Sequence, residues 1–145
     1  MRLSILSTAS VAILCSTLVM GAARAETMKF HADLTASAET PATTSKGTGK
    51  AEITYDTADK KLSWTVTYAD LSGPATAGHF HGPAPAGKSA GVAVPFAGDL
   101  KSPIKGSATL TDAQAKDLEA GEYYVNVHTA ENKAGEIRGQ VMPVK

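Results

Sequence analysis

Apolar and polar residues alternate along most of the chain after residue 27, in runs short enough to be β-strands. The clearest pair covers residues 51–55 and 62–68, which are separated by a turn at 56–60. This pattern predicts a hairpin with one face in the core and one face in water. Trp64 is expected at the centre of the core. Residues 28–36 alternate in the same way and predict an earlier strand.

The rest of the chain predicts more short strands and a single helix. The helix is expected at residues 111–120, because Thr111 and Gln114 form a capping box and Gly121 supplies a C-terminal stop. Residues 71–77 are interpreted as a linker. The expected strands are residues 78–82, 92–96, 106–110, 122–129 and 136–142. About eight short strands without a βαβ rhythm predict an all-β fold, an antiparallel β-sandwich or barrel with one short helix.

The N-terminus has the layout of a secretory signal peptide. Arg2 precedes a mainly apolar run, and Ala23 and Ala25 occupy the positions of a cleavage site before Glu26. The predicted organisation is a signal peptide at residues 1–25 followed by one domain at residues 26–145. An uncleaved membrane anchor is the alternative. Cleavage would leave no membrane anchor and a periplasmic or secreted protein.

Composition narrows the possible partners. The only cysteine, Cys15, lies in the expected signal peptide, so the exported domain would contain no disulfide. Loss of Arg2 and Arg24 would leave 12 basic against 14 acidic residues, a net charge of −2. There is no basic patch interleaved with aromatic residues, and we therefore expect no nucleic-acid partner. The partner is expected to be an unidentified protein or a metal ion.

Three of the four histidines form the main candidate site. His79 and His81 are two apart in a strand, so they project from the same face, and Phe80 points the other way. On residues 123–129 the same alternation places His128 on the face opposite the core. If the two strands are neighbours, the three imidazoles can share one ion, and copper or zinc is the expected metal.

Several residues around this site remain open to two interpretations. Asn126 shares the face of His128 and is expected beside the ligands, where it holds an imidazole or a water molecule. His31 is interpreted as a solvated strand residue, with a fourth ligand as the alternative. Glu131 and Glu136 are interpreted as charged turn residues or as a source of an oxygen ligand. The three histidines themselves are alternatively exposed, or hydrogen-bonded to loops without any metal.

Beyond these patterns, the chain resembles the CHRD domain, the module named after chordin. The resemblance rests on GHFHGPAPAGKSAG (78–91), on AGEYYVNVHTAENKAGEIRGQV (120–141), and on FHADLTASAETPATTSKGTGKAEITYD (30–56) with Glu39 and Pro41 in its Glu-x-Pro loop. It covers nearly all of residues 28–142. The family implies an exported binding module whose biochemical role is largely unassigned.

A second similarity is to copper–zinc superoxide dismutases. That family carries a Gly-x-His-x-His strand, a later Val-His, and an arginine near the C-terminus, which correspond here to His79, His81, His128 and Arg138. The similarity implies an immunoglobulin-like or superoxide-dismutase-like sandwich, and a small copper redox enzyme in which Arg138 attracts the anion. The bridging histidine, the zinc ligands and the disulfide of that family are missing. Independently of this similarity, Arg138 is expected beside the ligands or in the wall of the site, where it adds positive potential, or else paired with a strand carboxylate.

These observations predict a binding module with a three-histidine site for divalent copper or zinc and no assigned catalytic residue, so enzymatic activity stays open. The alternatives are a copper enzyme of superoxide dismutase type and a structural or protein-interaction domain without metal.

Overall fold

A computed structural model describes residues 25–145 of the chain. Residues 1–24 lie outside this part. The signal peptide expected at residues 1–25 therefore remains a prediction. The described chain forms nine β-strands, one short 3₁₀ turn and one α-helix. Their bounds are β1 (Thr27–Thr35), the 3₁₀ turn (Ala36–Ala38), β2 (Thr48–Asp56), β3 (Lys61–Ala69), β4 (Ala75–His81), β5 (Val92–Pro95), β6 (Ile104–Thr109), α1 (Asp112–Glu119), β7 (Tyr124–Thr129), β8 (Ile137–Gln140) and β9 (Met142–Pro143).

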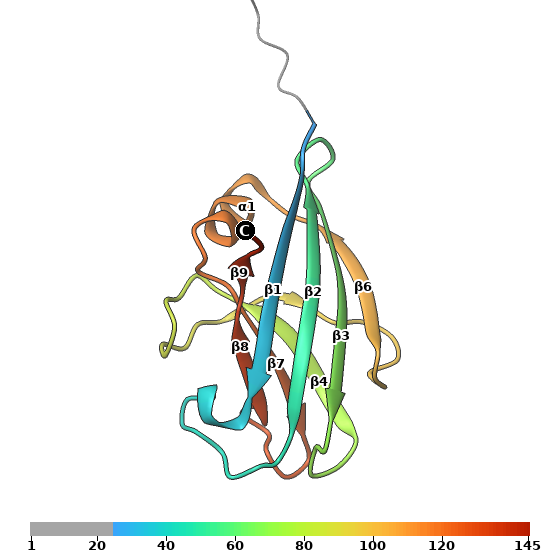
Figure 1. Ribbon diagram of the computed structural model, residues 1–145, viewed down its shortest axis with the longest axis vertical. Helices are drawn as coiled ribbons and strands as arrows, with labels where there is room; N and C mark the ends of the chain where they lie inside the picture. The colour runs from blue at the N-terminus through green and yellow to red at the C-terminus, as the bar shows by residue number, and fades with distance from the viewer. Residues whose placement is uncertain (1–24) are drawn as a thin grey trace, which may run out of the picture.

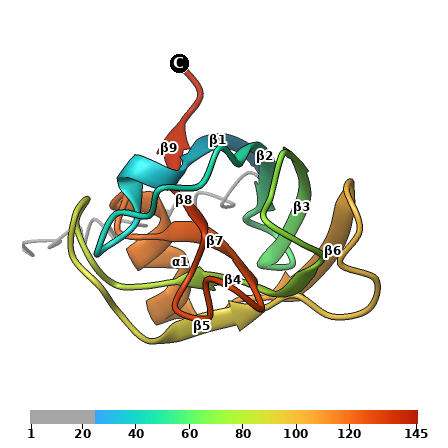
Figure 2. The same cartoon turned by 90° about the horizontal axis from the view of Figure 1, so that it is seen from below.

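The strands pair in one antiparallel ladder with the order β5-β4-β7-β8-β1-β2-β3-β6, and β9 adds to β1. The ladder bends over on itself, so that β1, β2 and β3 form one wall and β4, β5 and β7 lie opposite (Figures 1 and 2). The predicted all-β antiparallel sandwich with one short helix is therefore confirmed. Strands β4 and β7, which carry the candidate histidines, are direct neighbours.

The core fills the space between these walls. Trp64 of β3 lies in the core, as predicted. Its ring centroid is 5.2 Å from the ring centroids of Phe80 and Phe96. Apolar residues from both walls surround this aromatic group and have almost no exposure: Phe30, Leu34, Ile53, Leu62, Val66, Val94, Ile104, Val125, Val127 and Ile137. Burial of this apolar surface is the main stabilising contribution, at about 25 cal/mol per Å² removed from water.

The predicted hairpin is confirmed as β2 and β3, which pair along their whole length from Thr48↔Ala69 to Asp56↔Lys61. The capping box of α1 is also confirmed, since the Gln114 backbone N–H donates to the Thr111 hydroxyl and the Thr111 N–H donates to the Gln114 side chain. Gly121 follows the helix with a positive φ of 75°, the conformation expected of a glycine stop.

Most strand bounds differ from the expectation by one to three residues, and two of the differences change how the chain runs. The expected linker ends earlier, because β4 begins at Ala75, whose partner in the ladder is Thr129 of β7. The expected last strand is divided into β8 and β9. Between them the backbone N–H of Val141 donates to the carbonyl of Tyr123, and the Val141 side chain is fully buried. The chain therefore leaves the β7 ladder after Gln140 and continues beside β1.

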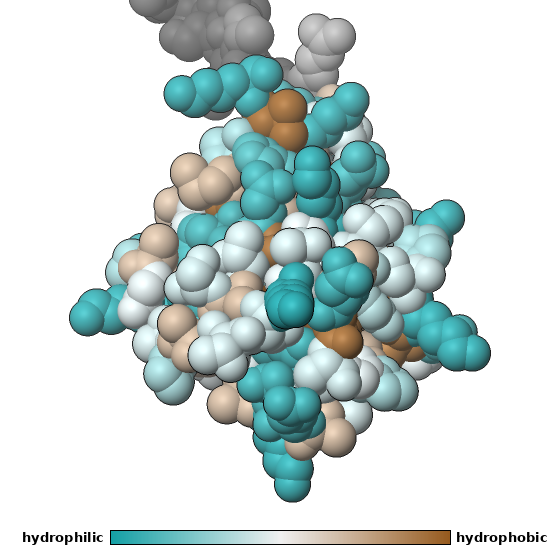
Figure 3. All heavy atoms as spheres, turned by 60° about the horizontal axis from the view of Figure 1, so that its bottom comes forward, coloured by the Kyte–Doolittle hydropathy of each residue, from teal (hydrophilic) through white to brown (hydrophobic). Residues whose placement is uncertain are grey.

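The end of the sandwich that Figure 3 brings forward presents mainly hydrophilic and neutral side chains, with only small hydrophobic areas. Glu136, which directly precedes β8, is fully buried. Its carboxylate accepts hydrogen bonds from the Ser45 hydroxyl at 2.6 Å, from the N–H and hydroxyl of Ser72 at 2.6 Å each, from the Thr129 hydroxyl, and from the Asn132 amide at 3.1 Å. Burial opposes ionisation, but these hydrogen bonds outweigh it and lower the pKa of Glu136 to about 2. The expected charged turn residue is therefore a buried anion that joins separate loops.

Candidate metal centre

Strands β4 and β7 bring the three predicted histidines to the outer face of the second wall. Phe80 is completely buried in the core, and this fixes His79 and His81 on the opposite face of β4. On β7, Val125 and Val127 are buried inward in the same way. The antiparallel register pairs His79 with Asn126, so that His128 lies diagonally from His79.

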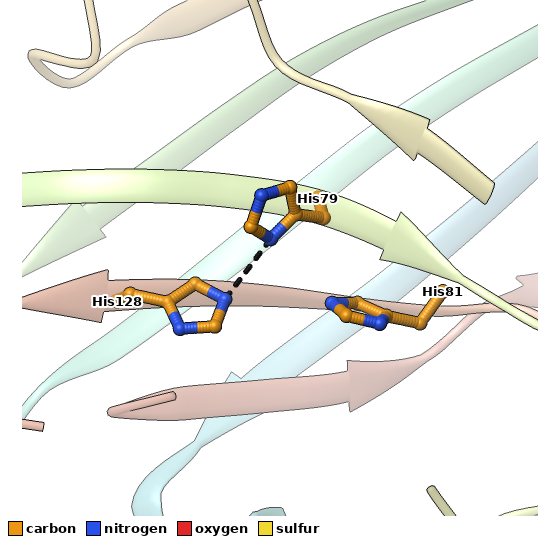
Figure 4. Close-up of side chains that lie close together, drawn as sticks. All are labelled: His79, His81 and His128. Atoms are coloured by element: carbon orange, nitrogen blue, oxygen red, sulfur yellow. Dashed lines mark hydrogen bonds between the residues drawn. The ribbon is translucent and has the colours of Figure 1, made fainter. Parts of the chain in front are cut away.

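The three imidazoles converge. His79 Nδ1 lies 3.0 Å from His128 Nε2, and one nitrogen from each of the three rings lies within 4.8 Å of the others. Figure 4 shows His81 turning one nitrogen toward the other two rings. Nitrogens that share an ion at 2.0–2.1 Å can be at most about 4.2 Å apart. Small side-chain rotations would therefore bring all three onto one metal, and the arrangement fits a three-histidine ligand set.

Hydrogen bonds from the other ring nitrogens orient two of the imidazoles. His128 Nδ1 donates to the carbonyl of Lys133 at 2.9 Å, and His81 Nδ1 donates to the carbonyl of Ala90 at 3.0 Å. Each neutral ring then presents a lone pair at Nε2, which is the form that binds a metal. Without metal, His79 Nδ1 donates to His128 Nε2. To bind an ion through Nδ1, the neutral His79 ring would carry its proton on Nε2 instead.

The surroundings of His79 and His81 favour the neutral form of these two rings. Burial lowers the pKa of His79, and the neighbouring His128 and His81 lower it further. Burial also lowers the pKa of His81, although the oxygens of Ala90 and Asn126, which favour the protonated ring, oppose this. Metal ligands must be deprotonated, so lowered histidine pKa values favour metal binding at neutral pH.

The loop 82–91 forms one wall of the site and is attached to it by side chains of the sheet. Tyr124 stacks on His81, with ring centroids 4.9 Å apart, and its hydroxyl contacts the backbone N–H and carbonyl of Ala90. Arg138 lies over the Tyr124 ring at 3.5 Å and donates to the carbonyl of Lys88 at 2.5 Å. The ring of Tyr124 thus connects the loop to both neighbouring strands.

Arg138 lies over the Tyr124 ring, next to the site. Its side chain is only 2% exposed and makes no salt bridge with a strand carboxylate among the described residues. The guanidinium binds a loop carbonyl and an aromatic face instead, because the loop 82–91 folds over β8 at this point. Arg138 therefore contributes to the site wall, where it is covered from solvent.

Asn126 lies next to the imidazoles, as expected, and is 3% exposed. Its Oδ1 is 3.1 Å from His81 Nε2. Behind it lies Glu39, a carboxylate that neither a ligand motif nor strand periodicity indicates. Glu39 is 8% exposed, and burial raises its pKa, which the Thr40 N–H, Arg138 and Asn126 counteract. The only signal for Glu39 in the sequence is its place in the Glu-x-Pro loop.

The remaining candidates do not join this site. His31 is exposed on the outer face of β1, opposite Glu52 and Met142, as expected for a solvated strand residue. Glu136 is occupied by the hydrogen bonds described above, and Glu131 is exposed. Neither belongs to the three-histidine group.

These features define an all-β domain with three convergent imidazoles on one sheet face. The CHRD domain family model matches residues 30–141, so the chain belongs to the CHRD family. No curated protein and no solved structure matches the chain. Within residues 25–145, none of the helices is long and apolar enough to span a membrane.

Proposed function

We propose that this CHRD domain is an exported binding module that holds one divalent ion, copper or zinc, at His79, His81 and His128. The observation that carries the proposal is the convergence of three imidazole nitrogens within 4.8 Å. The backbone carbonyls that fix two of the ring tautomers support it, because they leave the distal nitrogens free for an ion.

Binding without turnover is favoured over a copper redox enzyme of the superoxide dismutase type. In that alternative Arg138 would attract the anion, but here its guanidinium is covered by the loop 82–91 and stacked on Tyr124. An anion approaching the histidines would meet no exposed cation at this position.

The test is metal content and thermal unfolding of residues 26–145 with copper(II), with zinc and with a chelator. We expect one ion per chain and a raised Tm, because a ligand that binds only the folded state stabilises it by RT ln(1 + [L]/Kd). Both effects should disappear in a His79→Ala/His81→Ala/His128→Ala variant. A His31→Ala variant is the matched control, since it removes an exposed histidine outside the site.

Two results would contradict the proposal. One is a wild-type protein that takes up no metal. The other is uptake that the triple variant retains. If the triple variant is also less stable without metal, the imidazoles have a structural role and attach the loop 82–91 and the carbonyl of Lys133 to the sheet.

Export is the second part of the proposal, and its support is the pattern of residues 1–25. The intact mass of protein recovered from outside the cytoplasm tests it. We expect a chain that begins at Glu26. A full-length chain retained in the membrane fraction would instead favour the uncleaved anchor.

A further inference from the structure

His81 lies between two oxygens that cannot both accept a proton from a neutral ring. Its Nδ1 is 3.0 Å from the carbonyl of Ala90, and its Nε2 is 3.1 Å from Asn126 Oδ1. A neutral imidazole has one N–H, and a backbone carbonyl can only accept it. The proton is therefore on Nδ1, and the Nε2 lone pair faces the lone pairs of an amide oxygen. A cation between these two atoms would turn this repulsion into attraction.

A rotation of the Asn126 side-chain amide that exchanges Oδ1 and Nδ2 would remove this repulsion. Glu39 opposes that rotation. Asn126 Nδ2 and Glu39 Oε1 both lie next to Gly135, and Asn126 acts on the Glu39 carboxyl. A Cβ at Gly135 would collide with Oε1 and lie 2.8 Å from Nδ2. Oε1 is buried and accepts no hydrogen bond within the described chain. The carboxylate thus needs the amide N–H on its side, and this leaves Oδ1 directed at His81.

The distances at this point match those inside a coordination shell. Two atoms bound to one ion at 2.0–2.1 Å are about 2.9 Å apart at a right angle and about 3.4 Å apart in a tetrahedron. The His81 Nε2–Asn126 Oδ1 distance of 3.1 Å and the His79 Nδ1–His128 Nε2 distance of 3.0 Å both fall in this range.

We propose that Asn126 Oδ1 is the fourth ligand of the metal site, and that Glu39 is the positioning residue that turns this oxygen toward the ion. This inference rests on the proposed function. It changes the ligand set from three nitrogens to three nitrogens and one neutral oxygen. An amide oxygen is a hard ligand, so the site would favour a divalent ion, copper(II) or zinc, over copper(I), which prefers sulfur.

A double-mutant cycle tests the proposal. Affinities for copper(II) and for zinc are measured by competition with a chelator for five proteins: wild type, Asn126→Ala, Glu39→Gln, Asn126→Asp and Glu39→Gln/Asn126→Asp. Asn126→Ala removes the oxygen, and Glu39→Gln lets the amide turn its nitrogen toward the ion. We expect each to weaken binding by roughly 10- to 100-fold, the usual cost of disturbing the groups around a metal.

The Asn126→Asp background shows whether Glu39 acts by orienting the side chain at position 126 or by a general effect on the structure. A carboxylate at position 126 would present an oxygen in either orientation, so Glu39→Gln should not weaken metal binding there, and removal of a like charge should, if anything, strengthen it. Glu52→Gln is the matched control, because it removes an exposed carboxylate on β2. The copper(II) electron paramagnetic resonance spectrum gives a second readout. It should change in Asn126→Ala and in Glu39→Gln and stay unchanged in Glu52→Gln.

The outcomes distinguish this proposal from the one it rests on. If the wild type binds no metal, both are wrong. If the wild type binds metal and Asn126→Ala binds it equally well with the same spectrum, only the fourth ligand is wrong. An equal loss for Glu39→Gln in both backgrounds would overturn the positioning role. If Asn126→Ala does not fold, the comparison of Glu39→Gln with and without Asn126→Asp still decides the question.

Discussion

Replacing Glu136 with glutamine removes one charge from the buried hydrogen-bond network at the end of the sandwich. The glutamine oxygen can still accept from Ser45 and from the Ser72 N–H. Its amide nitrogen, however, would face the Asn132 amide, which is itself a donor in the native network. The variant thus loses a charge-assisted set of hydrogen bonds and brings two donors together.

The magnitude follows from the pKa of Glu136. It falls from 4.5 to about 2 in the folded protein. At 1.36 kcal/mol per unit, ionised Glu136 contributes about 3 kcal/mol to the free energy of unfolding at pH 7. For a domain of roughly 120 residues, 1 kcal/mol corresponds to about 4 °C in Tm, so we expect Glu136→Gln to lower Tm by about 12 °C.

The pH dependence has a definite sign. The unfolded chain binds a proton at Glu136 below pH 4.5, whereas the folded chain resists protonation until about pH 2. The contribution is therefore complete above pH 4.5 and is lost as the pH falls toward 2. At pH 3.5 about 1.4 kcal/mol should be gone, so the difference between wild type and Glu136→Gln should be roughly half its value at pH 7.

Urea unfolding at pH 7, 5 and 3.5, followed by the fluorescence of Trp64, measures these differences. Glu131→Gln is the control, because Glu131 is an exposed carboxylate in the same turn and should change the free energy of unfolding by less than about 0.5 kcal/mol. A Glu136→Gln effect below about 1 kcal/mol at pH 7 would refute the argument. So would an effect that is the same at pH 7 and pH 3.5.

Three further predictions concern the candidate site. The lowered pKa values of His79 and His81 predict that metal affinity is nearly constant at neutral pH and falls only below the ordinary histidine pKa of 6.5, by up to tenfold per pH unit for each imidazole that must lose a proton. Affinities that rise on acidification would contradict this. Gly135→Ala should lower the free energy of unfolding, measured by urea unfolding, by about 2 kcal/mol or more, because φ is 132° and a Cβ would meet Glu39. An effect below about 0.5 kcal/mol would show that the turn adapts. Tyr124→Phe removes the hydroxyl that is hydrogen-bonded to the backbone of Ala90. It should accelerate hydrogen exchange in the loop 82–91 and lower Tm by only a few degrees. Unchanged exchange would mean that other contacts hold the loop.

The regular part of the fold was predictable because strand periodicity is local. The alternation in residues 51–68 determined both the hairpin and its buried face, and the same rule placed His79, His81 and His128 on the outward face of their strands. That these strands are neighbours is a matter of topology, and the prediction had to assume it.

The surroundings of Glu39, Arg138 and Glu136 could not be predicted from the sequence. They depend on contacts between loops, which no local pattern encodes. Glu39 reaches Asn126 from a loop 87 positions earlier in the chain, and Arg138 binds the carbonyl of a residue 50 positions away. Glu136 was interpreted as a turn residue because carboxylates beside turns are usually solvated. Its burial requires donors from two distant loops, at Ser45 and Ser72, which only the folded chain brings together.

The Glu136 network also has a practical consequence for handling the protein. It joins loops that are more than 60 positions apart, as a disulfide does in many small exported domains, yet residues 25–145 contain no cysteine. This cross-link forms without an oxidant and is insensitive to a reductant. We therefore expect the domain to fold in a reducing cytoplasm and in thiol-containing buffers, and we expect acid to open the cross-link by protonating Glu136.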